Sequence, residues 1–298
     1  MRKKPLVVYH GPNCLDGLAS AWCMWSKFGN DAEYVVGRYQ SDDMPDFKDR
    51  VVFLVDFSYP VGTLVEHILP VANKVYVIDH HKTALNAYMD VEAENLDMRW
   101  SSMDHSGAVL AWLFINNISV EYDYLAPQVP FLLRVIEDYD LWKFNFPSTR
   151  AICTALFSRN LSIGDFSGLM FAGTAAINNL QQEGELLVKV QMKRCEDVAK
   201  KTIRTIPISL DYDLTVNMPV VNAGTDLAND IGELLTVTEH PFVAIYYDNE
   251  KHRVFSLRSN EKNANAIDVS KIALAYGGGG HKHAAGFKVA RDHYLARA

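Results

Sequence analysis

The sequence predicts a two-domain α/β protein. Its length of 298 residues exceeds that of one typical domain. In the first half, short apolar runs that fit buried strands alternate with amphipathic helical stretches, a pattern typical of a parallel sheet with helices on both faces. In the last third, strand-like runs predominate and indicate a smaller α+β domain. We therefore expect an N-terminal domain over residues 1–205, which ends in a helical linker from about residue 168, and a C-terminal domain over residues 206–298.

The N-terminal elements follow from hydrophobic periodicity. Continuous apolar runs predict strands at residues 6–9, 51–55 and 75–78. Apolar side chains at helical spacing predict helices over residues 18–28, 64–69, 107–114 and 131–137. Residues 168–204 are rich in Leu, Val, Lys, Glu and Gln and contain no proline, which predicts one or two linking helices that end before Pro207.

The C-terminal elements are shorter. Strands are predicted at residues 216–221, 242–247, 254–258 and 286–289, with helices at 226–235 and 268–275. The polar stretch at residues 248–251 predicts a hairpin turn between the second and third of these strands.

Charge and composition narrow the classes of partner. The net charge of −7 argues against a protein that grips long duplex nucleic acid through many phosphate contacts. A small anionic substrate remains compatible, because bound cations reverse the local potential. The apolar run after the basic N-terminus is too short for a signal peptide, no stretch reaches a membrane-spanning length, and the four cysteines are scattered. A cytoplasmic protein with reduced thiols is expected.

Metal-ligating residue types follow all three N-terminal strands. The first strand runs into His10, with Cys14 and Asp16 in the next loop; the second runs into Asp56; the third runs into Asp79-His80-His81. The carboxyl ends of parallel strands lie along one edge of a sheet, so these side chains should converge. A single Asp after a strand is more often a helix cap, but so many ionisable groups at neighbouring strand ends favour a bound cation.

Five ordered motifs resemble one family. They are HGPNCLDG (10–17), VDFSYP (55–60), the Asp-His-His triplet (79–81), EDYDLW (137–142) and GGGGHKHAAGF (277–287). Together they are similar to the DHH phosphoesterase superfamily with its associated C-terminal domain, and they span almost the whole chain.

The resemblance implies two divalent metal ions. One would be held by His10, Cys14 and Asp56, and the other by Asp16, Asp56, His80 and an Asp of the fourth motif, with Asp56 as the bridge. Asp138 is favoured over Asp140 for that last position because it ends the preceding helical run. Asp56, His80 and His81 would be the catalytic residues, with His81 at the scissile phosphate or the attacking water.

Cys14 departs from the commonest family pattern, which has Asp at this position. Manganese is the expected metal, and a softer thiolate ligand would favour Zn, Fe or Co. The alternative is that Cys14 is a small apolar loop residue that binds no metal.

The C-terminal domain would recognise the substrate. The resemblance implies binding by Arg258 and Ser259 at a strand end and by Gly279, Gly280, His281 and His283 in the glycine-rich motif. Arginine suits bidentate phosphate recognition, and glycine amides can approach an anion closely. The substrate would lie in a cleft between the domains.

The implied function is a phosphodiesterase that cuts short single-stranded oligonucleotides or dinucleotides with hydroxide activated by two metal ions. A pyrophosphatase or exopolyphosphatase on the same metal core is one alternative, and a catalytically silent nucleotide-binding module is another. A redox dinucleotide domain is disfavoured because the glycine run lies far from the first strand. The exact substrate and the oligomeric state, including a homodimer, stay open.

Overall fold

The computed structural model describes residues 3–39, 43–121, 129–211, 214–237 and 239–297. The chain forms two units, Met1–Val188 and Lys189–Ala298. The division falls within the long helix α8 (Gly173–Thr202), so the expected linker helix contributes residues to both units. Strand β6 (Arg204–Asp211) follows the end of α8.

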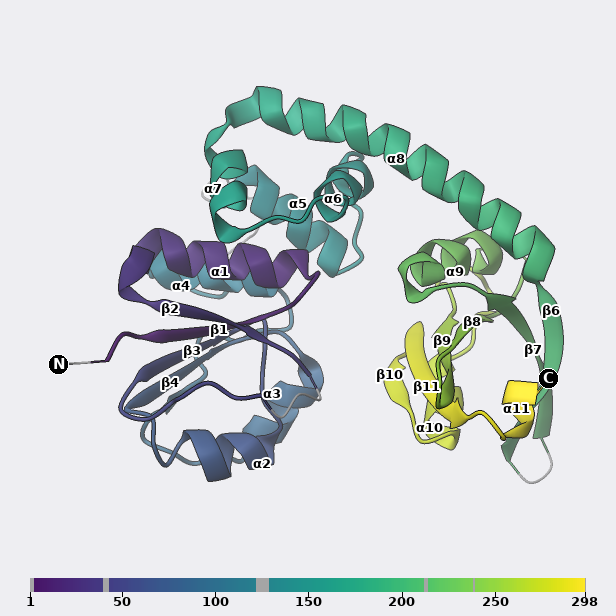
Figure 1. Ribbon diagram of the computed structural model, residues 1–298, viewed down its shortest axis with the longest axis horizontal. Helices are drawn as coiled ribbons and strands as arrows, with labels where there is room; N and C mark the ends of the chain where they lie inside the picture. The colour runs from purple at the N-terminus through teal and green to yellow at the C-terminus, as the bar shows by residue number, and fades with distance from the viewer. Residues whose placement is uncertain (1–2, 40–42, 122–128, 212–213, 238, 298) are drawn as a thin grey trace. The chain divides into compact units, whose positions relative to one another are not determined.

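A parallel five-stranded sheet forms the centre of the first unit (Figure 1). The strand order is β2 (Glu33–Gly37), β1 (Leu6–His10), β3 (Val51–Val55), β4 (Lys74–Ile78), β5 (Leu96–Asp97). The three predicted strands are confirmed and are the three central ones. The edge strands β2 and β5 were not predicted.

Side chains of the central strands alternate between two hydrophobic cores. In β3, Phe53 and Val55 belong to one core, whereas Val52 and Leu54 belong to the other. A strand that is buried on both faces loses the alternation of polar and apolar residues, which is why these strands are continuous apolar runs in the sequence.

Helices cover both faces of the sheet (Figure 1). One face carries α1 (Leu15–Phe28) and α4 (Gly107–Asn116). The other carries α2 (Val61–Thr63), the π-helical turn Leu64–Ile68 that continues it, and α3 (Lys82–Tyr88). The predicted arrangement of helices on both faces is therefore confirmed.

Further helices lie beyond α1 in this unit. They are α5 (Phe131–Asp140), α6 (Thr149–Phe157), α7 (Ile163–Phe171) and the first part of α8. Helices α5, α6 and α7 contact α1, and their buried residues extend its core.

The second unit contains a mixed six-stranded sheet in the order β10, β11, β9, β8, β7, β6. Its other elements are β7 (Leu214–Asn222), α9 (Ala228–Thr236), β8 (Val243–Asp248), β9 (His252–Arg258), α10 (Val269–Ala275), β10 (Gly279–His281), β11 (Ala284–Ala290) and α11 (Tyr294–Arg297). The predicted strands and the hairpin turn between β8 and β9 are confirmed. Strand β6 was missed because it contains Pro207, which an edge strand tolerates.

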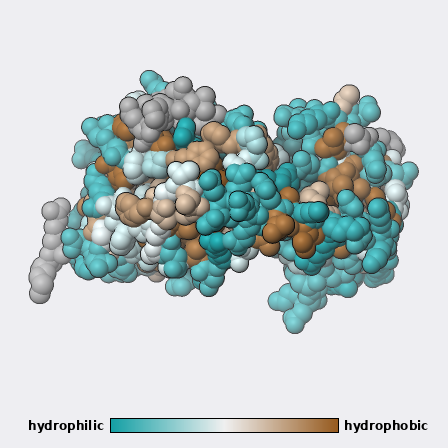
Figure 2. Space-filling view, turned by 90° about the horizontal axis from the view of Figure 1, so that it is seen from above, coloured by the Kyte–Doolittle hydropathy of each residue, from teal (hydrophilic) through white to brown (hydrophobic). Residues whose placement is uncertain are grey.

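Surface hydrophobicity is spread over both units. On the face shown in Figure 2, hydrophobic residues are interspersed with hydrophilic ones. None of the helices in the described part of the chain combines the length and apolar character that crossing a lipid bilayer requires.

Candidate metal centre

The candidate centre lies at the carboxyl ends of three adjacent strands. Strand β1 ends at His10, Asp56 follows β3, and Asp79, His80 and His81 follow β4. These strands are neighbours in the sheet. The predicted convergence of side chains from separate strands is therefore present.

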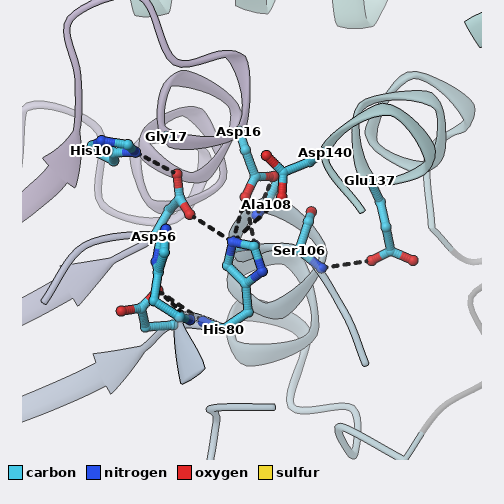
Figure 3. A network of polar contacts seen from close by, with 12 residues as sticks. His10, Asp16, Gly17, Asp56, His80, Ser106, Ala108, Glu137 and Asp140 are labelled. Carbon is cyan, nitrogen blue, oxygen red and sulfur yellow. Dashed lines mark hydrogen bonds and ion pairs between the residues drawn. The ribbon is translucent and has the colours of Figure 1, made fainter. Parts of the chain in front are cut away.

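Asp56 is the central residue of the cluster (Figure 3). Its Oδ2 lies 3.5 Å from Nδ1 of His10 and accepts a hydrogen bond from the Cys14 thiol at 3.4 Å. Its Oδ1 lies 3.1 Å from Nε2 of His80. The two carboxylate oxygens thus face two different groups of side chains, and His10, Cys14 and Asp56 form the first group.

The second group consists of Asp16, His80 and Asp140. Nε2 of His80 lies 3.8 Å from Oδ2 of Asp16 and 3.5 Å from Oδ2 of Asp140. Asp16, in the first turn of α1, is buried and accepts hydrogen bonds from the amides of Gly107 and Ala108 at the start of α4. In each group the potential ligand atoms lie within 4.8 Å of one another.

The structure favours Asp140 over the expected Asp138 of the fourth motif. Asp138 is buried, and its carboxylate accepts hydrogen bonds from the amides of Asn145 and Phe146 and from the Thr149 hydroxyl. Asp138 therefore holds the turn after α5, and Asp140 is the residue that lies with Asp16 and His80. The two residues are about 200° apart around the helix axis, so only one of them can face the cluster.

Asp79, the first residue of the triplet, was expected at this edge of the sheet but was assigned no role of its own. It is fully buried, its Oδ1 lies 2.7 Å from Nδ1 of His81, and its Oδ2 accepts a hydrogen bond from the Ser58 hydroxyl. A carboxylate at Nδ1 fixes the ring orientation of a histidine. The only hint of this contact in the sequence was that Asp79 lies two residues before His81.

An aromatic side chain that sequence reasoning also missed lies beside the cluster. The Tyr39 ring centroid is 5.2 Å from that of His10 and 6.0 Å from that of His81. Nothing in the sequence singled out this residue.

Burial and charge shift the pKa values of the cluster in opposite directions. Although burial alone raises the pKa of Asp56, hydrogen bonds with His10 and His80 outweigh it and hold that pKa well below its usual range. Burial and the charge of Asp56 raise the pKa of Asp140 to about 6. Burial and the charges of Asp56 and Asp140 also raise the pKa of Asp16.

The pKa of His80 is also raised. Burial lowers its pKa, but the hydrogen bond with Asp56 and the charges of Asp16 and Asp140 outweigh this and raise it to about 10. The buried carboxylates of Asp16 and Asp56 and the more exposed carboxylate of Asp140 therefore repel one another around His80. A divalent cation would remove this repulsion, and imidazole, carboxylate and thiol donors suit such an ion. The residues present fit a metal centre.

Cys14 caps helix α1 and also lies beside potential metal ligands. As the N-cap of α1, its sulfur accepts a hydrogen bond from the Gly17 amide at 3.3 Å. Burial, together with the charges of Asp56 and Asp16, raises the pKa of the Cys14 thiol. The thiol can therefore cap the helix while protonated, and it lies close enough to His10 and Asp56 to share a cation with them as a thiolate.

The predicted substrate residues of the second unit lie on neighbouring strands. Arg258 ends β9, and its Nε donates to Oδ1 of Asn229 at 2.8 Å. The Ser259 hydroxyl lies 2.9 Å from Nδ1 of His283 and donates to the carbonyl of Ile267. Arg258 pairs with Ala284, the residue after His283, across β9 and β11. The structure thus brings Arg258, Ser259 and His283 together.

The glycine-rich stretch has a second physical explanation besides anion binding. The amides of Gly277 and Gly278 donate to carbonyls of α10. A Cβ on Gly280 would lie 2.5 Å from the Cα of Ala285, whereas one on Gly279 would meet nothing within 4 Å. Gly280 is therefore required by its close approach to β11, while Gly279 and His281 are exposed.

No protein-family model matches the sequence. The chain is 26% identical over 301 aligned residues to an uncharacterized protein, R106, of Acanthamoeba polyphaga mimivirus; the alignment covers 94% of this chain, and the chain spans 66% of that protein's length.

Solved structures are similar at low sequence identity. The DHH domain of a member of the s1p family of ribosomal proteins matches with a TM-score of 0.58 and 12% identity, over 97% of this chain and 83% of that one. A pGpG-specific phosphodiesterase from Vibrio cholerae matches with a TM-score of 0.48 and 13% identity, over 97% and 94% of the two chains. The chain has the fold of DHH-domain proteins, which confirms the fold that the motifs implied.

Proposed function

We propose that this chain, with its DHH fold, is a metal-dependent phosphoesterase that hydrolyses phosphodiester bonds in small nucleotides. The observation that carries the proposal is the position of Asp56, whose two oxygens face two separate groups of potential metal ligands. A carboxylate between two such groups can hold two cations a few ångströms apart, an arrangement that suits phosphoester hydrolysis.

The proposed ligands of the first cation are His10, Cys14 and Asp56. Those of the second are Asp16, Asp56, His80 and Asp140. Cations held there would neutralise charge on the phosphate and lower the pKa of a bound water. Manganese is the proposed metal, with Zn, Fe or Co as the ions that a Cys14 thiolate would favour.

The protein residues around the ligands have their own tasks. Asp79 holds His81 by Nδ1, which directs Nε2 of that ring to the opposite side, and we propose that Nε2 contacts the scissile phosphate or the attacking water. Two backbone amides hold Asp16. Preorganised donors and ligands of this kind lower the barrier because they need little rearrangement during the reaction.

The second unit is proposed to recognise the substrate. Arg258 and His281 are the groups proposed to bind an anionic part of the nucleotide, with Ser259 and His283 beside Arg258 and the glycine backbone at Gly279 and Gly280. Burial lowers the pKa of Arg258, but a guanidinium stays charged at neutral pH.

A panel of phosphate substrates tests the proposal. The purified protein with Mn²⁺ is incubated with a short oligoribonucleotide, a linear and a cyclic dinucleotide, a bisphosphorylated nucleotide, pyrophosphate and polyphosphate, and initial rates are compared. We expect at least one nucleotide phosphoester to be cut faster than pyrophosphate and polyphosphate. Faster hydrolysis of pyrophosphate or polyphosphate would favour the phosphoanhydride alternative. Nucleotide binding without any hydrolysis would favour a silent binding module.

A further inference from the structure

We propose that Glu137 is a positioning residue for Asp16 and acts through the backbone at the start of α4. Only the role of Asp16 as a metal ligand is taken from the proposed function. Glu137 itself belongs to none of the groups of potential metal ligands that the described residues form.

Glu137 is a buried carboxylate with a defined set of partners. The side chain has no exposed surface, and Oε2 accepts a hydrogen bond from the Ser106 amide at 3.0 Å (Figure 3). The same oxygen lies 3.2 Å from Nδ1 of His105. Taking a carboxylate out of water is unfavourable unless it is hydrogen-bonded or paired. Its partners both belong to the segment that leads into α4, so Glu137 fixes the position of that segment.

The next two amides of the same segment hold Asp16. The Gly107 amide donates to Oδ2 of Asp16 at 2.7 Å, and the Ala108 amide donates to Oδ1 at 3.0 Å. Three consecutive amides therefore lie between two buried carboxylates, the first bound to Glu137 and the other two to Asp16. Any shift of the segment moves the donors that set the orientation of both Asp16 oxygens.

The position of Glu137 on α5 connects it to the other acidic residue of the second group. Glu137 and Asp140 are three residues apart on α5, and residues at this spacing lie on the same side of a helix. Helix α5 thus supplies Asp140 directly and holds Asp16 through the start of α4. Both carboxylates lie near Nε2 of His80, at 3.8 Å for Asp16 and 3.5 Å for Asp140. Helix α5 therefore acts on two of the three members of this group, Asp140 and Asp16.

Manganese binding tests the role without any substrate. Affinities for Mn²⁺ are measured by titration calorimetry for the wild type, Glu137→Ala and Glu137→Gln, and for the ligand variants Asp16→Asn and His10→Ala. Loss of a residue that supports a ligand weakens metal affinity by roughly 10–100-fold. Asp16→Asn and His10→Ala should each weaken a different Mn²⁺ binding event. We expect Glu137→Ala to weaken the event that Asp16→Asn weakens and to leave the affinity of the other event unchanged. Glutamine keeps an oxygen that can accept from the Ser106 amide, so Glu137→Gln should restore most of the affinity.

Val135→Ala is the matched control for lost stability. Val135 is fully buried on the same helix and belongs to the hydrophobic core, so its truncation should lower the melting temperature without changing Mn²⁺ affinity. Equal weakening of both binding events in Glu137→Ala, or Mn²⁺ affinity in Glu137→Ala equal to that of the wild type, would overturn the proposal. If Glu137→Ala does not fold, the test rests on Glu137→Gln. An Mn²⁺ affinity of Glu137→Gln as weak as that of Asp16→Asn would then overturn the proposal. Mn²⁺ binding that follows the expected pattern in a protein that hydrolyses no phosphoester would contradict the proposed function and leave the role of Glu137 intact.

Discussion

The backbone of Asp56 has a conformation that few residues other than glycine adopt, with a φ of 52°. A non-glycine residue in this region is strained by roughly 1–2 kcal/mol. The side chain of this strained residue is the carboxylate that lies between His10 and His80. Strain of this kind persists where the surroundings hold the residue in place, and it is concentrated at functional sites.

Asp56→Asn tests the importance of this carboxylate. Asparagine keeps the size of the side chain but offers one neutral oxygen in place of two anionic ones, so both groups of ligands lose their shared anion. We expect kcat/KM to fall by at least about 100-fold, while the melting temperature stays near that of the wild type. Asp97→Asn is a suitable control, because Asp97 is also a buried aspartate at the end of a strand of the same sheet. Turnover of Asp56→Asn near the wild-type level with Mn²⁺ in excess would refute the bridging role.

Substitutions at Cys14 separate helix capping from metal binding. Serine and aspartate are both good N-caps, so Cys14→Ser and Cys14→Asp should preserve the stability of α1. If the thiolate binds a cation, Cys14→Ser should weaken binding of Zn²⁺ and Co²⁺, and Cys14→Asp should shift the preference towards Mn²⁺ and Mg²⁺. Metal content and the relative affinities for these ions are the measurements. Identical metal preferences in all three proteins would leave Cys14 as a cap alone.

Residue types at strand ends could be read from the sequence, but their orientation could not. His10, Asp56 and His80 were predicted together because parallel strands end at one edge. The structure places Asp140, rather than the expected Asp138, beside Asp16 and His80, because helical phase depends on how α5 packs against its neighbours. Glu137 and Tyr39 were missed for a similar reason, since their contacts are with residues distant in sequence.

At the scale of the elements, the start of α4 determines how closely the helix approaches the sheet. A Cβ on Gly107 would lie 2.4 Å from the Cβ of Asp56 and 3.0 Å from Oδ2 of Asp16. The absence of a side chain at Gly107 therefore allows α4 to approach both carboxylates. The adjoining amides can then hold Asp16.

Gly107→Ala should disrupt this approach. The added methyl group must displace Asp56 or the first turn of α4, and overpacking of this kind destabilises a protein by roughly 1–3 kcal/mol. We also expect a loss of hydrolysis larger than the loss of folded protein explains, because either Asp56 or the amides that hold Asp16 move. Gly168→Ala is the control: Gly168 lies within α7, and a Cβ there would meet nothing within 4 Å. A Gly107→Ala protein as stable and active as the wild type would show that the close contact is not needed.

Strands and helices with a clear hydrophobic pattern in the sequence were predicted. Strands that form only because they pair with a neighbouring strand were not. Central strands such as β3 are buried on both faces and are therefore continuous apolar runs. Strand β5 has two residues, and β6 contains Pro207. Both lie at sheet edges, where their partners rather than their own composition make them strands.

At the scale of the whole molecule, the fold has two sheets with different chemistry around them. The parallel sheet of the first unit carries the potential metal ligands at its carboxyl edge. The mixed sheet of the second unit carries Arg258 at the end of β9, with its aliphatic part against Gly232 of α9. A division between bond cleavage and substrate recognition is the natural hypothesis for such an architecture, and kinetics can test it.

Arg258→Ala and His80→Ala should affect different substrates. Loss of a contact made equally in the ground state and the transition state raises KM, whereas loss of metal chemistry lowers kcat. Arg258→Ala should therefore impair nucleotide hydrolysis by roughly 2–4 kcal/mol if a charge-assisted bidentate contact is lost. It should impair hydrolysis of a minimal chromogenic phosphodiester far less, because that substrate has no group for Arg258 to bind.

His80→Ala should damage hydrolysis of both substrates alike, because His80 lies among the potential metal ligands. Arg258→Lys is a further control, since lysine keeps the charge but cannot form the planar bidentate contact and should recover only part of the loss. The deciding measurement is kcat/KM for each variant on each substrate. Equal losses for Arg258→Ala on both substrates would refute the division and place Arg258 at the reacting phosphate, because only a group at that phosphate is common to the two reactions.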